Sequence, residues 1–459
     1  MSDASAATTS PVDVHAAYVE RLVDLMPPGG NVLLGASDDD LRNALAAGDL
    51  EPLRRLRGQW AGLAKVGNVV RMARSIGRPM RFFLAKRTEG PCLVVAERID
   101  AIRDWLRAEG LGDQFHPSYT RMVPAHYLTE LRLIGCPDPS PTLTRYFTPE
   151  RNAAPADVAE CGRRYIGALA DTLSAWLDWA DRRFGIDEPL GVLFSGGIDS
   201  GAVLLVTEHL LRARGQSPAR LKAFTLAVDG RSPDAEQAFA FLDAVDLTML
   251  LEVVDVPAAA ISPRRAVAVT EDYKPLDIQA AAMGIALLEA VRGQSPDWRL
   301  LLDGDGGDEN LKDYPIEANP ELTIRSVLNN PLLYHEGWGV HAVKHSQTYS
   351  GGQSRGHVRT AAPARLFGFE GFSPFATPAV IEQAEAIPFI ELTEWDHDRL
   401  YRLKGEVVRA GVEAVTGRTM PIFEKRRFQD GATQHPLVPD DEPAFRGYLR
   451  EHLAAASAS

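Results

Sequence analysis

The sequence has few cysteines, no long apolar run and no basic stripe. Its three cysteines, Cys92, Cys136 and Cys161, form no CxxC pair, so neither a disulfide framework nor a zinc site is predicted. No stretch reaches the roughly 20 apolar residues that a membrane span needs. The net charge is -13 and the basic residues are scattered, which disfavours a surface that follows nucleic-acid phosphates. These absences exclude nucleic acid and membrane as expected partners and favour small molecules.

The first residues, MSDASAATTSPVD, also lack the basic and apolar stretches of a targeting sequence. Together with the unpaired cysteines, this predicts a soluble cytoplasmic protein. The chain has 459 residues, of which 45% are hydrophobic and 24% charged. That length and composition predict two domains with ordinary hydrophobic cores.

A stretch rich in proline and polar residues, at 137–157, divides the chain. Before it, short apolar runs such as NVLLGA, RFFLAK and CLVVAE alternate with turn residues, which predicts a mixed, largely antiparallel α+β domain over residues 1–150. After it, residues 158–184 show a helical pattern, and apolar strands then alternate with helices. Residues 151–459 are therefore predicted to form an α/β domain with a doubly wound parallel sheet and a mainly helical C-terminal part.

The run GVLFSGGIDSGAVLL combines a buried strand, a tight loop with two glycines and the start of a helix. Glycines let the backbone approach an anion closely, and the first free N–H groups of the helix direct partial positive charge at it. The loop is therefore predicted to hold phosphate. It is not the common nucleotide loop, because G-x-x-x-x-G-K-[ST] is absent from the chain.

This loop resembles the SGGxDS signature of the ATP-pyrophosphatase families, and LLLDGDGGDENLKDYP is similar to the strand and GEGxDE string of the asparagine synthetase and β-lactam synthetase group. The resemblance implies ATP and Mg²⁺ as cofactors, with Asp199 and Asp308 as magnesium ligands. The alternative, in which Asp199 caps a helix and Asp308 is a loop charge, stays open. The nucleotide contacts that the resemblance implies are Leu193, Ser195, Gly196, Gly197, Asp199, Ser200, Leu226, Asp303 and Gly304.

Two C-terminal strings extend the resemblance. RLFGFEGFSPF is similar to the group's GVExRxPFLD segment, which makes Glu370 the counterpart of its acid/base glutamate. IFEKRRFQDGA is similar to RxKxxFxxG, which places Lys425 against pyrophosphate and the adenylated intermediate. Each residue has a plainer reading, as a surface charge or as part of a solvated basic run. Lys404, in YRLKGEVVR, resembles a family lysine beside the site.

The N-terminal region resembles the later part of the group's glutaminase domain, a fold that uses an N-terminal nucleophile, in LRRLRGQWAGLAKVGNVVRMARSIGRPMRFFL and CLVVAERIDAI. Glutamine-using members begin with a cysteine after processing, whereas this chain has Ser2, and the residues after Ser2 form no apolar strand to hold it. The expectation is a degenerate glutaminase-like domain. The amine would then be free ammonia, a second substrate, or a group within the acyl substrate.

Some positions depart from the group's pattern. Lys312 and Asp313 add charges after GDGGDE, which predicts a different pocket. Tyr273, Lys274 and Asp277 lie at an expected helix start and either contact substrate or cap the helix. The segment 349–359 is read as an exposed loop or a lid over the site.

These features predict an ATP-dependent amide-forming ligase that adenylates a small-molecule carboxylate, releases pyrophosphate and transfers the acyl group to an amine that does not come from glutamine. Two alternatives stay open: an ammonia-dependent asparagine synthetase, and a nucleotide-binding scaffold without catalysis. The oligomeric state also stays open, with a homodimer as one possibility.

Overall fold

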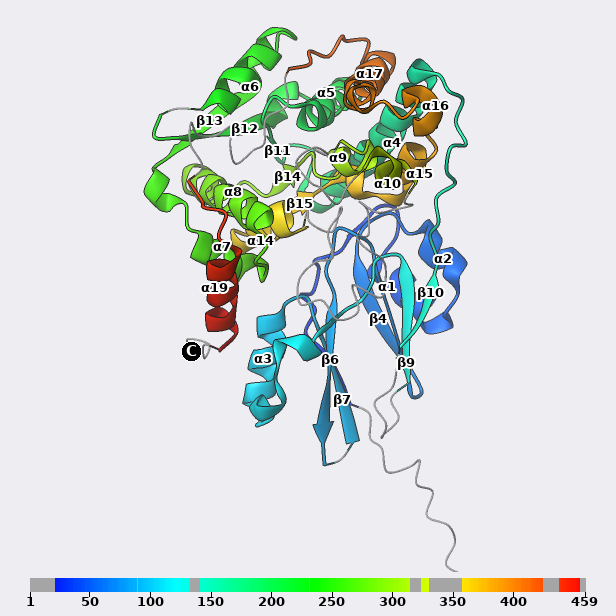
Figure 1. The fold of residues 1–459 in the computed structure, drawn as a ribbon, viewed down its shortest axis with the longest axis vertical. Coiled ribbons are helices and arrows are strands. Elements are labelled where there is room, and N and C mark those ends of the chain that lie inside the picture. The colour runs from blue at the N-terminus through cyan, green and yellow to red at the C-terminus, as the bar shows by residue number, and fades with distance from the viewer. Residues whose placement is uncertain are drawn as a thin grey trace, which may run out of the picture.

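The computed structural model describes residues 21–88, 90–132, 141–230, 232–313, 323–329, 357–423 and 437–454. The N-terminal part, blue to cyan in Figure 1, lies beside a larger part that contains the rest of the chain. The boundary predicted near residue 150 falls between the last strand of the first part and the long helix α4 (Val158–Phe184).

The N-terminal part is built on two four-stranded sheets that pack on each other. One has the order β1-β7-β6-β8 and the other β10-β9-β5-β4. All neighbouring strands are antiparallel except β1 and β7. Apolar side chains of both sheets, including Met72, Phe82 and Leu93, form a shared core. The elements are β1 (Arg21–Asp24), β2 (Val32–Leu33), α1 (Asp38–Ala47), α2 (Leu50–Arg55), β3 (Gly58–Gln59), β4 (Ala61–Val66), β5 (Val69–Arg74), β6 (Arg81–Arg87), β7 (Gly90–Ala96), α3 (Ile99–Ala108), β8 (Arg121–Met122), β9 (Tyr127–Arg132) and β10 (Thr142–Arg145).

The second part contains a five-stranded sheet in which every pair of neighbours is parallel, with the order β13-β12-β11-β14-β15. Its strands are β11 (Leu190–Leu193), β12 (Leu221–Val228), β13 (Leu251–Val256), β14 (Leu300–Leu302) and β15 (Glu370–Phe372). The predicted α/β fold class is confirmed. The edge strand β15 is an addition to the prediction, because its three residues sit in a segment whose pattern is otherwise helical.

Helices cover both faces of this sheet, as Figure 1 shows. On one face, apolar residues of α4, α5, α6 and α17 pack against Leu190, Val192 and Leu300. On the other, Met283 and Leu287 of α8 pack against Phe224, Leu226 and Leu301 of the strands. The helices of this part are α5 (Ile198–Ala213), α6 (Pro233–Asp243), α7 (Pro263–Thr270), α8 (Pro275–Gln294), α9 (Gly307–Asn310), α10 (Ile324–Asn329), the π-helical turn η8 (His357–Ala361), α14 (Ala362–Leu366), α15 (Pro378–Glu385), α16 (Phe389–Thr393), α17 (His397–Thr416) and α19 (Glu442–Ala454).

The strand order reverses at β11. The chain runs outward from β11 through β12 to β13, and then returns to the other side of β11 with β14. In open α/β sheets, ligands bind beyond the carboxyl ends of the strands at such a switch point. The loops that follow β11 and β14 are those that contain SGGIDS and DGDGGDE.

Among the described residues, no helix is long and apolar enough to cross a membrane.

Candidate functional site

The loop after β11 has the backbone that its glycines predict. Gly196 has a φ of 71°, and a Cβ atom there would lie 2.8 Å from the backbone nitrogen of Ala238. Gly197 is the N-cap of α5 and has no side chain to occupy the first free N–H groups of that helix. These groups are therefore available to an anion, as the sequence predicts for a phosphate loop.

The loop after β14 crosses the first loop at close range. A Cβ atom at Gly304 would lie 2.8 Å from the backbone nitrogen of Ser200, and one at Gly307 would lie 2.2 Å from Oδ1 of Asp199. A side chain at Gly304 would push the two loops apart, whereas one at Gly307 would displace the carboxylate of Asp199. The two loops therefore meet at Gly304, Ser200 and Asp199, which the sequence predicts as nucleotide contacts.

A buried lysine joins the two loops. Lys404 of α17 is 3% exposed, and its Nζ lies 2.6 Å from Oδ2 of Asp199 and 3.2 Å from Oδ2 of Asp313, and also contacts Oδ1 of Asp308. Burial alone would lower the pKa of Lys404, but the three carboxylates outweigh it and raise that pKa well above its usual value. Lys404 therefore holds a positive charge between the two carboxylates predicted to bind magnesium.

The two charges that follow GDGGDE have different roles. Asp313 faces Lys404, as described above. Lys312 points away from the site: its Nζ lies 3.0 Å from Oε1 of Glu385 in a pair that is almost fully buried, and it also lies over the ring of Phe389. Lys312 thus joins the loop to α15 and α16 and does not line a substrate pocket. Tyr314 and Pro315 lie outside the described residues.

Asp303 and Asp305 form a buried acidic pair behind the loops. Asp303 accepts hydrogen bonds from the Ser373 hydroxyl at 2.9 Å and from the Asp305 backbone at 3.0 Å. Burial and the neighbouring Asp305 raise the pKa of Asp303 well above its usual range. Burial raises the pKa of Asp305 to about 6, although Arg359 and a hydrogen bond from Thr360 lower it. The Asp303 carboxyl group therefore supports the loop from within, a role that differs from the predicted nucleotide contact.

The two predicted leucines differ in exposure. Leu193 ends β11 and is partly buried, so it can line the nucleotide site. Leu226 lies in β12, is 1% exposed and packs in the core with Phe224 and Val254. The Leu226 side chain is therefore not available to a nucleotide.

Glu370 lies away from these loops. It starts β15 at the level of Leu300, and the sheet edge that carries the loops begins at Asp303, about 10 Å further along the strand direction. Its carboxylate lies 3.9 Å from the guanidinium of Arg183, at the end of α4. The structure thus places Glu370 at the amino edge of the sheet, which does not fit the predicted base, and brings Ser373 to the loops instead. Lys425 lies outside the described residues.

The helix start at 272–277 is buried and acidic. Asp272 accepts hydrogen bonds from the backbone nitrogens of Tyr273 (2.6 Å) and Lys274 (2.9 Å), just before α8 begins at Pro275. Asp277 is fully buried and lies 3.1 Å from Nε of Arg359. Cζ of Arg446 in α19 lies over the ring of Tyr273, 3.8 Å from the ring centre. Arg359 belongs to the predicted loop at 349–359, most of which lies outside the described residues.

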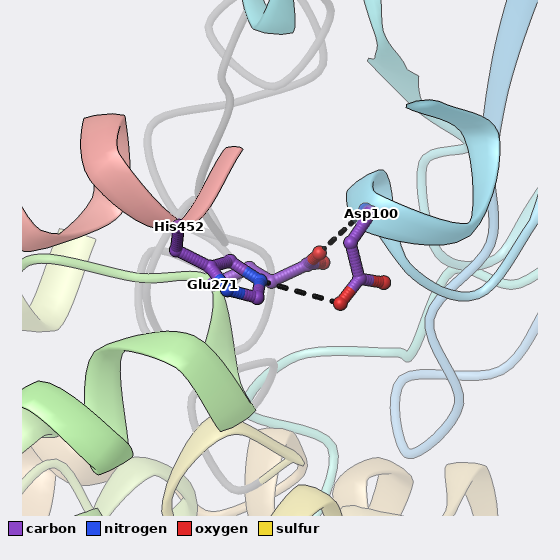
Figure 2. A group of neighbouring side chains, drawn as sticks. All are labelled: Asp100, Glu271 and His452. Carbon is purple, nitrogen blue, oxygen red and sulfur yellow. Dashed lines mark hydrogen bonds and ion pairs between the residues drawn. The ribbon is translucent and has the colours of Figure 1, made fainter. Parts of the chain in front are cut away.

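A second group of side chains, drawn in Figure 2, could hold a metal ion by position alone. Asp100, Glu271 and His452 come from α3, the end of α7 and α19. However, both Glu271 oxygens accept backbone N–H groups of α3 at 2.7 Å, and Arg98 lies 2.5 Å from Asp100 and 3.6 Å from Glu271. His452 completes the group at 3.2 Å from Asp100. Because Arg98 already neutralises the carboxylates, this group joins the two parts of the protein and is a poor metal centre.

A parallel sheet with glycine-containing loops and converging carboxylates at its switch point is typical of nucleotide-binding α/β domains. Residues 175–389 match the family model described as asparagine synthase, a match that covers a little under half of the chain. The chain is also similar to the protein named Amidase chyE of Penicillium rubens, with 26% identity over 207 residues. That match covers 44% of this chain and 29% of the Penicillium protein.

Proposed function

We propose that this protein is an ATP-dependent ligase that activates a substrate carboxylate as an acyl-adenylate and transfers the acyl group to an amine that does not come from glutamine. The observation that carries the proposal is the meeting of Asp199, Asp308 and the SGGIDS loop at the switch point of an asparagine synthase domain.

The proposed reaction has two steps. The substrate carboxylate attacks the α-phosphorus of ATP, an acyl–phosphate bond forms, and the bond to the β-phosphate breaks to release pyrophosphate. The free N–H groups at the start of α5 would stabilise the charge that develops on the leaving pyrophosphate. An amine then attacks the acyl carbon, loses a proton and displaces AMP.

Asp199 and Asp308 fit a magnesium ion. Both are carboxylates, the hard oxygen ligands that Mg²⁺ prefers, and they come within reach of the same ammonium group. Both side chains are also partly exposed, at 18% and 37%, so they can reach an ion shared with phosphates. When bound, the ion would neutralise phosphate charge. Lys404 would hold the two carboxylates in place, and Lys425 stays the predicted pyrophosphate lysine.

The state of the described cysteines supports an amine source other than glutamine. A cysteine that hydrolyses glutamine must be an accessible thiolate. Cys92 and Cys161 are both buried, and burial raises the pKa of each thiol. Cys92 lies in β7 among Phe83, Val94 and Ile102, which is an apolar core and not a substrate site. The name of the Penicillium relative also points to amide chemistry.

The test is ATP–pyrophosphate exchange with a panel of carboxylic acids, followed by product analysis with ammonia, glutamine or other amines. We expect exchange that depends on a carboxylate, and Asp199→Asn should abolish it. Asp243→Asn, an exposed change at the end of α6, is the matched control and should have no effect.

A requirement for aspartate and ammonia would identify the substrates as those of an asparagine synthetase. Two other results would contradict the proposal. Exchange that no carboxylate stimulates would favour a binding scaffold. Turnover that is faster with glutamine than with equimolar ammonia would refute the proposed amine source.

A further inference from the structure

One buried carboxyl oxygen beside the proposed site lacks the partner that its burial demands. Asp272 is fully buried, and its Oδ1 accepts the two backbone hydrogen bonds described above. Its Oδ2 is inaccessible to solvent and has no hydrogen-bond partner among the residues that the structure describes. Buried polar atoms without a partner are rare in folded proteins. One explanation for such an atom is that a ligand binds it.

The surroundings of Asp272 are rich in negative charge. Asp277 faces it from the first turn of α8, and burial and this second carboxylate raise the pKa of Asp272. Arg359 lies against Asp277, and Lys274 lies beside Asp272. Asp303 and Asp305 add two more buried carboxyl groups, so within the described part of the chain these carboxyl groups outnumber the cations Lys274 and Arg359.

These side chains continue into the proposed reaction site. Next to Arg359 on η8, Thr360 donates a hydrogen bond to Oδ2 of Asp305 at 2.5 Å. Asp305 belongs to the loop after β14, and its neighbour Gly304 packs against the backbone of Ser200. The acidic wall formed by Asp272, Asp277 and Asp305 therefore extends from the start of α8 to the phosphate loop.

We propose that this acidic wall binds an ammonium or guanidinium group of the substrate, with Oδ2 of Asp272 as its acceptor. The proposal rests on the ligase function proposed above and narrows its substrates to those with a cationic group. An organic cation fits better than a divalent metal ion, because only one oxygen of Asp272 is available and the Arg359 guanidinium would repel a double charge. Ammonium and guanidinium groups donate the hydrogen bond that Oδ2 lacks.

The experiment compares sets of carboxylic acids of equal length that end in an ammonium, a methyl or a carboxylate group, by ATP–pyrophosphate exchange. Amide formation is compared in the same way for diamines and monoamines. We expect the wild-type protein to prefer the cationic member in one of these assays by about 10- to 100-fold, as for hydrogen bonds to charged groups. Asp272→Asn should remove most of this preference, measured as the ratio of the rates with the cationic and the uncharged member.

Asp272→Asn keeps the oxygen that accepts the backbone hydrogen bonds of Tyr273 and Lys274, and its new amide can donate to Asp277, so we expect the variant to fold. Its midpoint of thermal unfolding without ligand should equal or exceed that of wild type, because a buried like-charge pair is removed. Asp243→Asn is the control and should keep the cationic preference.

Each remaining result identifies what fails. Exchange with no preference for cations, or a preference that Asp272→Asn retains, overturns the cation site and leaves the ligase intact. If no substrate supports exchange, both the ligase function and the cation site are refuted. Stabilisation of wild type but not Asp272→Asn by Mg²⁺ or Ca²⁺ alone would show an inorganic ion in this place and would also overturn the proposal.

Discussion

Replacing Lys404 by methionine removes the ammonium group that three carboxylates share and keeps most of the side-chain volume. Lys404 is 3% exposed, and its carboxylate partners are 18% (Asp199), 37% (Asp308) and 10% (Asp313) exposed. Removing one member of a buried ion pair costs about 3–5 kcal/mol, because the other charge stays buried without compensation. Since Asp308 is more than a third exposed, water screens its share, and most of the loss comes from Asp199 and Asp313.

We therefore expect Lys404→Met to lower the free energy of unfolding by about 3–5 kcal/mol, measured by urea titration. ATP–pyrophosphate exchange should be lost as well, because the two loops no longer share a cation. Adding Asp313→Asn to Lys404→Met should recover about 1–2 kcal/mol, since it removes one of the uncompensated charges.

Lys65→Met, an exposed change on β4, is the matched control and should leave stability within about 0.5 kcal/mol. A loss below about 1 kcal/mol for Lys404→Met, or no recovery with Asp313→Asn, would refute the idea that Lys404 holds these carboxylates together.

Three further predictions test other parts of the structure. Gly196→Ala should lower stability by about 1–3 kcal/mol and reduce exchange, because it combines a positive φ with a contact to Ala238, whereas Gly167→Ala in the open face of α4 should be neutral or stabilising. The pKa of Asp305 is raised from 3.8 to about 6, so the folded state binds the proton more tightly, and stability should fall by up to about 3 kcal/mol as pH rises from about 4 to 6. In urea titrations, Asp305→Asn should lack that fall, and an unchanged pH dependence would contradict the assignment. Asp100→Asn should cost about 1–2 kcal/mol of unfolding free energy and leave exchange intact, and loss of exchange would show that the group in Figure 2 serves the reaction.

The fold of the second part can largely be predicted from local patterns. The helix predicted at 158–184 is observed over the same residues, and Asp157 caps it by accepting hydrogen bonds from the backbone nitrogens of Ala159 and Glu160. The strand LKAFTLAV is observed as β12 without change of bounds. Long apolar strands and long amphipathic helices are predictable because most of their residues repeat the same signal. The three residues of β15 are too few to show such a repeat.

The candidate site can be predicted only where the backbone itself performs the function. Gly196, Gly197 and Gly304 belong to loops whose backbones approach other segments closely, and the glycines show that constraint directly in the sequence. Lys404 is indicated by resemblance alone, since a lysine within a helix shows no sign of three distant carboxylate partners. The sequence does not reveal the importance of Asp272 either, because its unpaired oxygen results from the packing of segments far apart in the chain.

The motif resemblance and the structure predict different effects of replacing Glu370. The motif predicts that Glu370→Gln spares adenylation and blocks capture of the amine. The structure predicts that both steps survive within about twofold, because the side chain lies at the amino edge of the sheet. There its carboxylate pairs with the exposed Arg183 at 3.9 Å, a contact worth about 0–1 kcal/mol.

The measurement is exchange and amide formation by the same preparation of Glu370→Gln, with Arg183→Gln as a control for loss of the surface pair. Retention of both steps would support the geometry and direct the search for a base to the loops after β11 and β14. A selective loss of amide formation of about tenfold or more in Glu370→Gln alone would show instead that β15 brings this carboxylate to the acyl-adenylate. The strand register that pairs Glu370 with Leu300 would then have to change during the reaction. In the present register, the Glu370 carboxylate and the loops after β11 and β14 lie on opposite edges of the sheet.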